Sequence, residues 1–203
     1  MTPDYAPCEA IAIGGSAGAV EIVVGLLAEL PASFSLPVLI CVHLHAGDRG
    51  QLADHLGTRS RVPVTEARDK TPIAAGRVHV APADYHLLVE RARTIALSID
   101  AKVHYCRPAI DVLFESAARA YGRGLCAILL SGANEDGVAG LGSVRAHGGL
   151  TVAQDPRTAS FPRMPELAVA AGVSARVLAP DGILDLVVRL DRAAAAPGRA
   201  RGG

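Results

Sequence analysis

The sequence predicts an α/β fold: a doubly wound, mainly parallel sheet with helices on both faces. Three apolar runs, which begin at Glu9, Leu36 and Leu125, have the length of strands that are buried on both faces of a parallel sheet. Segments with the apolar spacing of amphipathic helices alternate with these runs. This alternation is typical of β-α-β units.

The first half of the wound sheet is expected near the N-terminus. The run from Glu9 gives way to glycines, and the helix expected at 19–30 ends before Pro31. A second strand is expected at 36–44, and a shorter helix follows it at 47–56.

An antiparallel insert is expected around residues 77–99. Three short stretches typical of strands are joined there by tight polar turns: RVHVAP, HLLVE and TIALSID. Because these turns are too short for crossover helices, the three strands are expected to pair antiparallel.

The β-α-β alternation returns after the insert. A long helix is expected at 108–120, because Pro108 suits the first turn of a helix. The elements expected beyond it are a strand at 125–131, a helix at 138–147, a strand at 149–153, a helix at 164–171 and a short strand near 176–178.

One domain, residues 9–192, is expected to contain the whole core. Residues 1–8 are interpreted as an N-terminal extension. Residues 193–203 are mostly Ala, Gly and Arg with nothing to bury, which predicts a disordered tail.

Composition argues against several classes of protein. Of the 203 residues, 50% are hydrophobic, but no run approaches the ~20 apolar residues of a membrane span. The 20 basic residues balance the 20 acidic ones, which argues against nucleic acid as the main partner. No C-x-x-C pair and no signal peptide are present, so a reduced, cytoplasmic protein is expected. The cysteines are Cys8, Cys41, Cys106 and Cys126.

A candidate nucleophile follows the first strand. Ser16 lies in the segment GGSAG, at the carboxyl end of a predicted parallel strand, where open α/β sheets place their ligand sites. The glycines allow a sharp turn and the close approach of a substrate. The structural alternative is a strand-to-helix turn with the serine as helix N-cap.

Two nucleotide-binding motifs fail on the same segment. A dinucleotide fingerprint that starts at Gly14 finds Ser16 and Ala19 where two further glycines are needed. A P-loop must close on Gly-Lys-Ser/Thr, and the first lysine of the chain is Lys70. No cofactor is expected.

A candidate base follows the second strand. His43 ends the run LPVLICVHL, and consecutive strands of a parallel sheet are usually neighbours, so its imidazole is expected near the Ser16 hydroxyl. An imidazole that accepts the serine proton activates the hydroxyl. His45 is the rival base, and a histidine capped by a backbone carbonyl is the structural alternative. The spacing of His43, His45 and His55 matches no known ligand set, so no metal is expected.

A candidate carboxylate follows the third run. Glu135 and Asp136 lie in a glycine-bounded loop at the carboxyl end of the strand expected at 125–131. Either could orient the histidine as the aspartate of a Ser-His-Asp triad does, and a helix N-cap is the structural alternative. The α/β-hydrolases also use Gly-x-Ser-x-Gly but place the acid before the histidine, so the order of residues here differs from theirs.

These segments resemble the catalytic domain of the CheB chemoreceptor methylesterases, which hydrolyse glutamate methyl esters on bacterial chemoreceptors and deamidate certain receptor glutamines. The resemblance runs from about Ala10 to Ile183 and rests on six separate stretches. They are AIGGSAGA, LICVHLHAG, GRVHVAPADYHLLV, CRPAIDVLFESAA, ILLSGANEDGVAGL and AQDPRTASFPRMP.

The resemblance implies a catalytic triad of Ser16, His43 and Asp136. It also implies an oxyanion and substrate-binding region, and as partner the methylated cytoplasmic helices of chemoreceptors or another methylated protein. The residues of that region are Ala17, Gly18, Ala133, Arg107 and Met164. For Arg107 the alternative role is to stabilise its own loop, and for Met164 it is a place in the core.

The chain departs from the family pattern in three ways. Ala17 stands where the family usually has Thr, and Gly132-Ala133-Asn134 replaces Gly-Met-Gly. Only seven residues precede Cys8, too few for the receiver domain of typical members, so a regulator acting in trans is expected. The alternative function is a weakly active or non-catalytic scaffold that binds receptors or a regulator.

Overall fold

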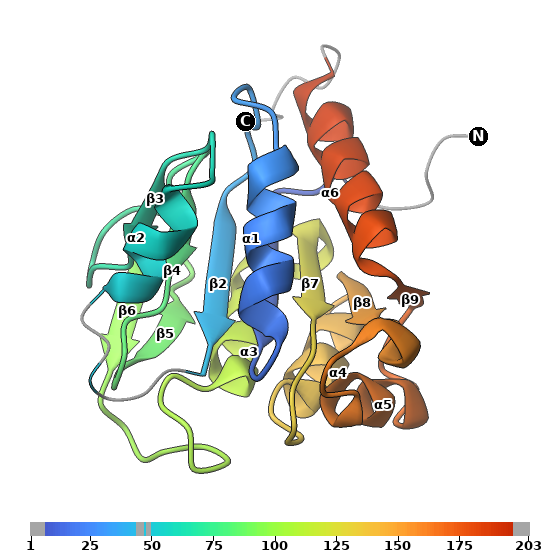
Figure 1. The fold of residues 1–203 in the computed structure, drawn as a ribbon. Helices are drawn as coiled ribbons and strands as arrows, with labels where there is room; N and C mark the ends of the chain where they lie inside the picture. Colours follow the sequence, from blue (N-terminus) through green and yellow to red (C-terminus); the bar gives the residue numbers. More distant parts are fainter. Residues whose placement is uncertain (1–6, 44–46, 48–49, 197–203) are drawn as a thin grey trace.

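The computed structural model describes residues 7–43, 47 and 50–196, and these residues contain a seven-stranded sheet with helices on both faces (Figure 1). The strands are β1 (Ala10–Gly15), β2 (Val38–Val42), β3 (Val64–Glu66), β4 (Val78–Val80), β7 (Leu125–Leu129), β8 (Leu150–Gln154) and β9 (Arg176–Leu178). All neighbouring strands are parallel, in the order β3-β4-β2-β1-β7-β8-β9. The predicted doubly wound parallel sheet is confirmed.

In the described part of the chain, three helices cover each face of the sheet. On one face lie α1 (Ala19–Glu29), α2 (Gln51–Gly57) and α6 (Pro180–Ala195). On the other lie α3 (Ile110–Tyr121), α4 (Val138–Ala146) and α5 (Arg163–Ala170). A separate hairpin of β5 (His86–Val89) and β6 (Ile95–Ser98) packs against α3. None of the described helices is long and apolar enough to cross a membrane.

Strand residues alternate between the two faces of the sheet. In β1, Ile11 and Ile13 pack on the side of α1 and α6, whereas the smaller Ala10 and Ala12 face α3 and α4. Further along β1, an added Cβ on Gly14 would lie 2.2 Å from Ile110 Cγ2. Small residues in β1 therefore let the first turn of α3 approach the carboxyl end of this strand.

The winding of the sheet reverses at β1. The chain first fills β2, β3 and β4 on one side of β1, and then β7, β8 and β9 on the other. Open α/β sheets bind ligands at such a reversal, outside the carboxyl ends of the strands. The neighbours β2, β1 and β7 therefore define where a site is expected.

The antiparallel insert is smaller than the sequence indicated. The pairing of β5 with β6 is antiparallel as predicted, but β4 is parallel to both β2 and β3 and belongs to the main sheet. The prediction of three antiparallel strands in residues 77–99 was therefore wrong for the first of them. β4 has only three residues, and its pairing follows from its contacts with β2 rather than from the short turn that leads to β5. β3 was not predicted, and the other predicted elements are found with small shifts of their ends.

The C-terminal part is more helical than predicted. α6 was not foreseen, and it includes residues 193–195, which the sequence assigned to a tail. Residue 196 directly follows α6, and residues 197–203 of that predicted tail lie outside the described residues. The buried Asp191 of α6 accepts hydrogen bonds from the backbone N–H groups of Ser35 (2.8 Å) and Leu36 (3.1 Å), which joins α6 to the loop before β2.

Candidate active site

Ser16 lies in the turn between β1 and α1. Its backbone N–H donates to the Ser131 carbonyl (2.9 Å), and its own carbonyl accepts from the Ala19 N–H (3.0 Å). Gly18 in the same turn has a φ of +74°, and an added Cβ would lie 2.8 Å from Ser160 Cβ. A crowded left-handed position of this kind favours glycine. The turn places Ser16 at the carboxyl edge of the sheet.

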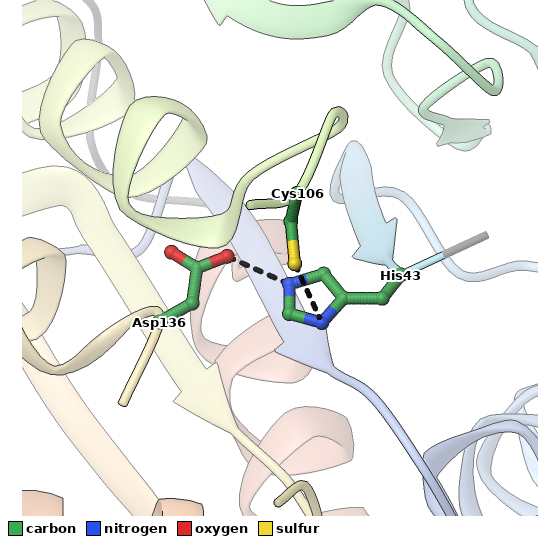
Figure 2. A group of neighbouring side chains, drawn as sticks. All are labelled: His43, Cys106 and Asp136. Atoms are coloured by element: carbon green, nitrogen blue, oxygen red, sulfur yellow. Dashed lines mark hydrogen bonds and ion pairs between the residues drawn. The ribbon is translucent and has the colours of Figure 1, made fainter. Parts of the chain in front are cut away.

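His43 follows β2 and links Ser16 to Asp136. Its Nδ1 lies 3.0 Å from Ser16 Oγ, and its Nε2 lies 2.7 Å from Asp136 Oδ2. In Figure 2, one dashed line joins the imidazole to the carboxylate of Asp136 and a second joins it to the thiol of Cys106. The imidazole is partly accessible, with 13% of the side chain exposed. The structure therefore joins the three residues that the sequence singled out.

The hydrogen bonds assign the tautomer of His43. An ionised carboxylate accepts and does not donate, so Asp136 Oδ2 pairs with a proton on Nε2. Nδ1 then keeps its lone pair and faces the Ser16 hydroxyl, as a general base requires. Compared with the triad of the chymotrypsin type, the two ring nitrogens exchange roles.

Asp136 is fully buried and is held by the start of α3. Its Oδ2 also accepts from the Ile110 N–H (2.7 Å), and its Oδ1 accepts from the Asp111 N–H (2.9 Å). Asp111 Oδ1 in turn accepts from the N–H groups of Gly137 (2.9 Å) and Gly140 (2.6 Å), at the start of α4. The Asp136 carboxylate therefore caps α3, and the Asp111 carboxylate, from the first turn of α3, caps α4. We call this arrangement the Asp111–Asp136 clasp.

Asp111 is expected to stabilise the fold through the clasp, a role that the sequence did not reveal. Burial raises the pKa of its carboxyl, against the opposing effect of the Gly140 amide. We expect Asp111→Ala to lower the free energy of unfolding, since each buried amide left without an acceptor costs about 1–3 kcal/mol. Asp111→Asn keeps an acceptor oxygen, so a smaller loss is expected. Urea denaturation measures both, and equal midpoints for wild type and Asp111→Ala would contradict the clasp.

Backbone amides near Ser16 are available to an oxyanion. Among the residues that the structure describes, no acceptor is found for the N–H groups of Ala17, Gly18 and Ala133. Ala17 and Gly18 follow Ser16 directly, and Ala133 lies in the loop that carries Asp136. Amides that are oriented in advance stabilise negative charge as it develops.

Ser131 and Gln154 support the loop of the nucleophile, and sequence reasoning missed both. Ser131 Oγ donates to the Ala17 carbonyl (2.8 Å) and accepts from the Phe161 N–H (2.9 Å). The Ser131 N–H donates to Oε1 of the buried Gln154 (2.9 Å). A polar residue at the carboxyl end of a buried strand is the signal that indicates such a support.

Two predicted binding residues make structural contacts. Arg107 donates to Asp84 Oδ1 (2.9 Å) and to the carbonyls of residues 99 and 100 (2.8 and 3.0 Å), so it stabilises its own loop. Met164 is fully buried beneath Gly132, whose added Cβ would lie 2.4 Å from Met164 Cε. These contacts match the structural alternative for each residue.

The rival catalytic residues lie elsewhere or are not described. Glu135 Oε1 lies 3.4 Å from His104 Nδ1, and the Glu135 side chain is 66% exposed. His45 is outside the described residues, and His55 is exposed on α2. Asp136, rather than Glu135, contacts His43.

Two groups of side chains within the described residues have donor atoms close enough to hold a metal ion. One is His43 with Cys106 and Asp136, and the other is His104 with Asp111 and Asp136. In the second group, both carboxylates are occupied by the backbone amides of the clasp. Sequence reasoning did not connect Cys106 with the site, although it directly precedes the Arg-Pro pair before α3.

Comparison with known sequences agrees with this geometry. A family model described as CheB methylesterase matches residues 11–187. A Leptospira interrogans protein, provisionally named protein-glutamate methylesterase/protein-glutamine glutaminase, is 41% identical over 91% of this chain and 95% of its own length. Proteins of that name from Pseudomonas aeruginosa and Symbiobacterium thermophilum are 42% and 36% identical over 83% and 92% of this chain. The chain spans about half of those two relatives, 49% and 51%.

A solved structure has the same fold. The crystal structure of the Thermotoga maritima CheB methylesterase catalytic domain matches with a TM-score of 0.86 and 28% identity. The match covers 91% of this chain and 100% of that one.

Proposed function

Because this chain belongs to the CheB methylesterase family, we propose that it is a serine hydrolase that removes methyl esters from glutamate side chains and deamidates glutamine side chains. The observation that carries the proposal is the hydrogen-bonded series from Ser16 through His43 to Asp136. The names of the relatives suggest the substrate class, and the geometry suits acyl transfer to water.

In the first half of the reaction, Ser16 Oγ attacks the side-chain carbonyl carbon of the methylated glutamate. His43 Nδ1 accepts the hydroxyl proton as the new C–O bond forms, and Asp136 stabilises the imidazolium through Nε2. The imidazolium then donates this proton to the methoxy oxygen as the ester bond breaks. Methanol leaves, and the glutamyl group remains bound to Ser16.

In the second half, water attacks the acyl carbon while His43 Nδ1 accepts one of its protons. The bond to Ser16 Oγ breaks, His43 returns the proton to that oxygen, and the substrate protein leaves with an unesterified glutamate side chain. Deamidation of glutamine follows the same steps with ammonia as the first leaving group. A single site therefore serves both reactions.

The backbone N–H groups of Ala17, Gly18 and Ala133 are assigned the stabilisation of the negative charge that develops on the carbonyl oxygen. These N–H groups belong to the backbone, so the substitutions at positions 17 and 133 leave them in place. The differences from the usual family side chains then affect the rate rather than the type of reaction.

Methylated cytoplasmic helices of chemoreceptors are the substrate that we propose, with the chain in the cytoplasm beside them and a regulator acting in trans. Exposed aromatic side chains on two loops that contact residues of the site suit a protein substrate. Tyr105, 96% exposed, precedes Cys106, and Phe161, 47% exposed, lies on the loop that is bonded to Ser131. Exposed aromatic residues of this kind are enriched where proteins bind.

A scaffold that binds receptors or a regulator without turnover is the alternative, and the alanine at position 17 favours it. We expect Ala17→Thr to raise kcat or leave it unchanged, because one added donor to the oxyanion contributes about 3 kcal/mol when well placed. Methanol release from methylated receptor measures this. If neither wild type nor Ala17→Thr released methanol, the scaffold function would replace the hydrolase.

The central experiment compares methanol release from methylated receptor by wild type and by Ser16→Ala. Ester hydrolysis that depends on Ser16 supports the proposed function.

A further inference from the structure

We propose that Cys106 and His43 form a binding site for a thiophilic divalent cation such as Zn²⁺, and that occupation of this site blocks the nucleophile. Binding of the cation does not depend on the proposed function. Only its consequence for catalysis rests on that function.

The spacing of the two donor atoms fits a tetrahedral cation. Cys106 Sγ lies 3.5 Å from His43 Nδ1 (Figure 2). Zinc bonds of about 2.3 Å to sulfur and about 2.0–2.1 Å to nitrogen, at a tetrahedral angle, separate the two ligand atoms by about 3.5–3.6 Å. The pair therefore needs little movement to bind Zn²⁺.

The groups around Cys106 and His43 resemble those that hydrogen-bond to the ligands of a metal site and orient them. Nδ1 is the nitrogen that keeps its lone pair, because Asp136 occupies Nε2. Carboxylates commonly orient metal-binding histidines in this way. Ser16 Oγ, 3.0 Å from the same Nδ1, offers an oxygen, and Asn134 Nδ2 lies 3.7 Å from the sulfur as an N–H donor. Cysteine, histidine and an oxygen or water form a ligand set that suits zinc.

Access makes Cys106 the thiol available to such a cation. The side chains of Cys8, Cys41 and Cys126 are buried, whereas Cys106 and the imidazole of His43 are partly exposed. On binding, the cation takes the place of the thiol proton, which passes to solvent, and an S–Zn bond forms. No oxidation or reduction is involved.

Occupation of the site removes the base from the reaction. A lone pair on Nδ1 that binds Zn²⁺ cannot accept the proton of Ser16. The cation would therefore act as a reversible inhibitor, in contrast to the zinc of a metallohydrolase, which activates water. Metal availability would then control turnover.

Cobalt and zinc titrations of the purified chain test the site without any assay of activity. We expect Co²⁺ to produce the near-ultraviolet charge-transfer band of a thiolate–cobalt bond in wild type, and calorimetry to show one bound Zn²⁺. Cys106→Ser should abolish the band and weaken Zn²⁺ binding by an order of magnitude or more. Cys106→Ala provides a second variant if the serine form does not fold.

Control variants separate this site from its neighbours. His147→Ala removes an exposed imidazole elsewhere and should leave the band unchanged, and His104→Ala tests the nearby group with Asp111. A wild-type protein without the band, equal Zn²⁺ affinity in Cys106→Ser, or loss of the band in His104→Ala alone would overturn the proposal.

An activity measurement tests the consequence separately. Zn²⁺ should inhibit methanol release by wild type, a chelator should restore it, and Cys106→Ser should be less sensitive to the cation. If the band is present but the apo protein releases no methanol, the proposed function fails and the metal site stands. If the apo protein is active and the bound cation does not inhibit, the blocking role is wrong.

Discussion

Replacing Ser16 with alanine is expected to lower the rate of methanol release from methylated receptor by about four to six orders of magnitude. Alanine removes the oxygen that carries the acyl group but leaves the amides of Ala17, Gly18 and Ala133 in place. The remaining rate would come from substrate binding and oxyanion stabilisation alone. Methanol release by equal amounts of wild type and variant, over the same substrate range, gives the ratio.

A matched variant guards against a general effect of the substitution. Ser33→Ala changes an exposed serine outside the site and should retain the wild-type rate. Thermal unfolding should be similar for wild type and Ser16→Ala, because the Ser16 side chain makes its hydrogen bond to partly exposed His43. Undiminished methanol release by a folded Ser16→Ala protein would exclude Ser16 as the nucleophile.

The sequence predicted that Ser16, His43 and Asp136 meet, because their meeting depends on strand order. Ser16, His43 and Asp136 each follow the carboxyl end of an apolar strand, and the strands β2, β1 and β7 are direct neighbours. Apolar runs reveal such strands even in a single sequence. Parallel neighbours then place their carboxyl ends at one edge, whatever the details of the helices.

The surroundings of the site depend on packing that no local pattern encodes. Asp111 reaches the start of α4 because α3 lies close to β1, and this approach depends on small residues such as Gly14. Cys106 meets His43 only after the loop before α3 crosses the end of β2. These contacts join residues far apart in the sequence.

β4 and α6 differ from the prediction for different physical reasons. β4 has three residues, too few for an alternation of side chains to indicate its partner, and it joins the parallel sheet through β2. α6 buries Ile183, Leu186 and Val187, and this i, i+3, i+4 spacing is typical of one face of a helix. Its last turn is a run of alanines, which favour a helix without burying large side chains.

Replacing His43 with alanine is expected to lower methanol release about as much as the loss of Ser16, because the members of a triad act as a unit. Without the imidazole, the described residues show no base hydrogen-bonded to the Ser16 hydroxyl. The Cys106 thiol beside His43 cannot replace it, because burial raises the pKa of this thiol and keeps it protonated. The double variant Ser16→Ala/His43→Ala should therefore release methanol at nearly the same rate as either single variant.

His45→Ala is the comparison that decides between the two histidines. The described contacts of His43 with Ser16 and Asp136 already supply a complete path for the proton, so removal of the His45 imidazole should change the rate little. A large loss in His45→Ala with a small loss in His43→Ala would mean that His45 is the base. Losses in the two single variants that multiply in the double variant of Ser16 and His43 would show that these residues act independently, because a shared proton transfer can be abolished only once.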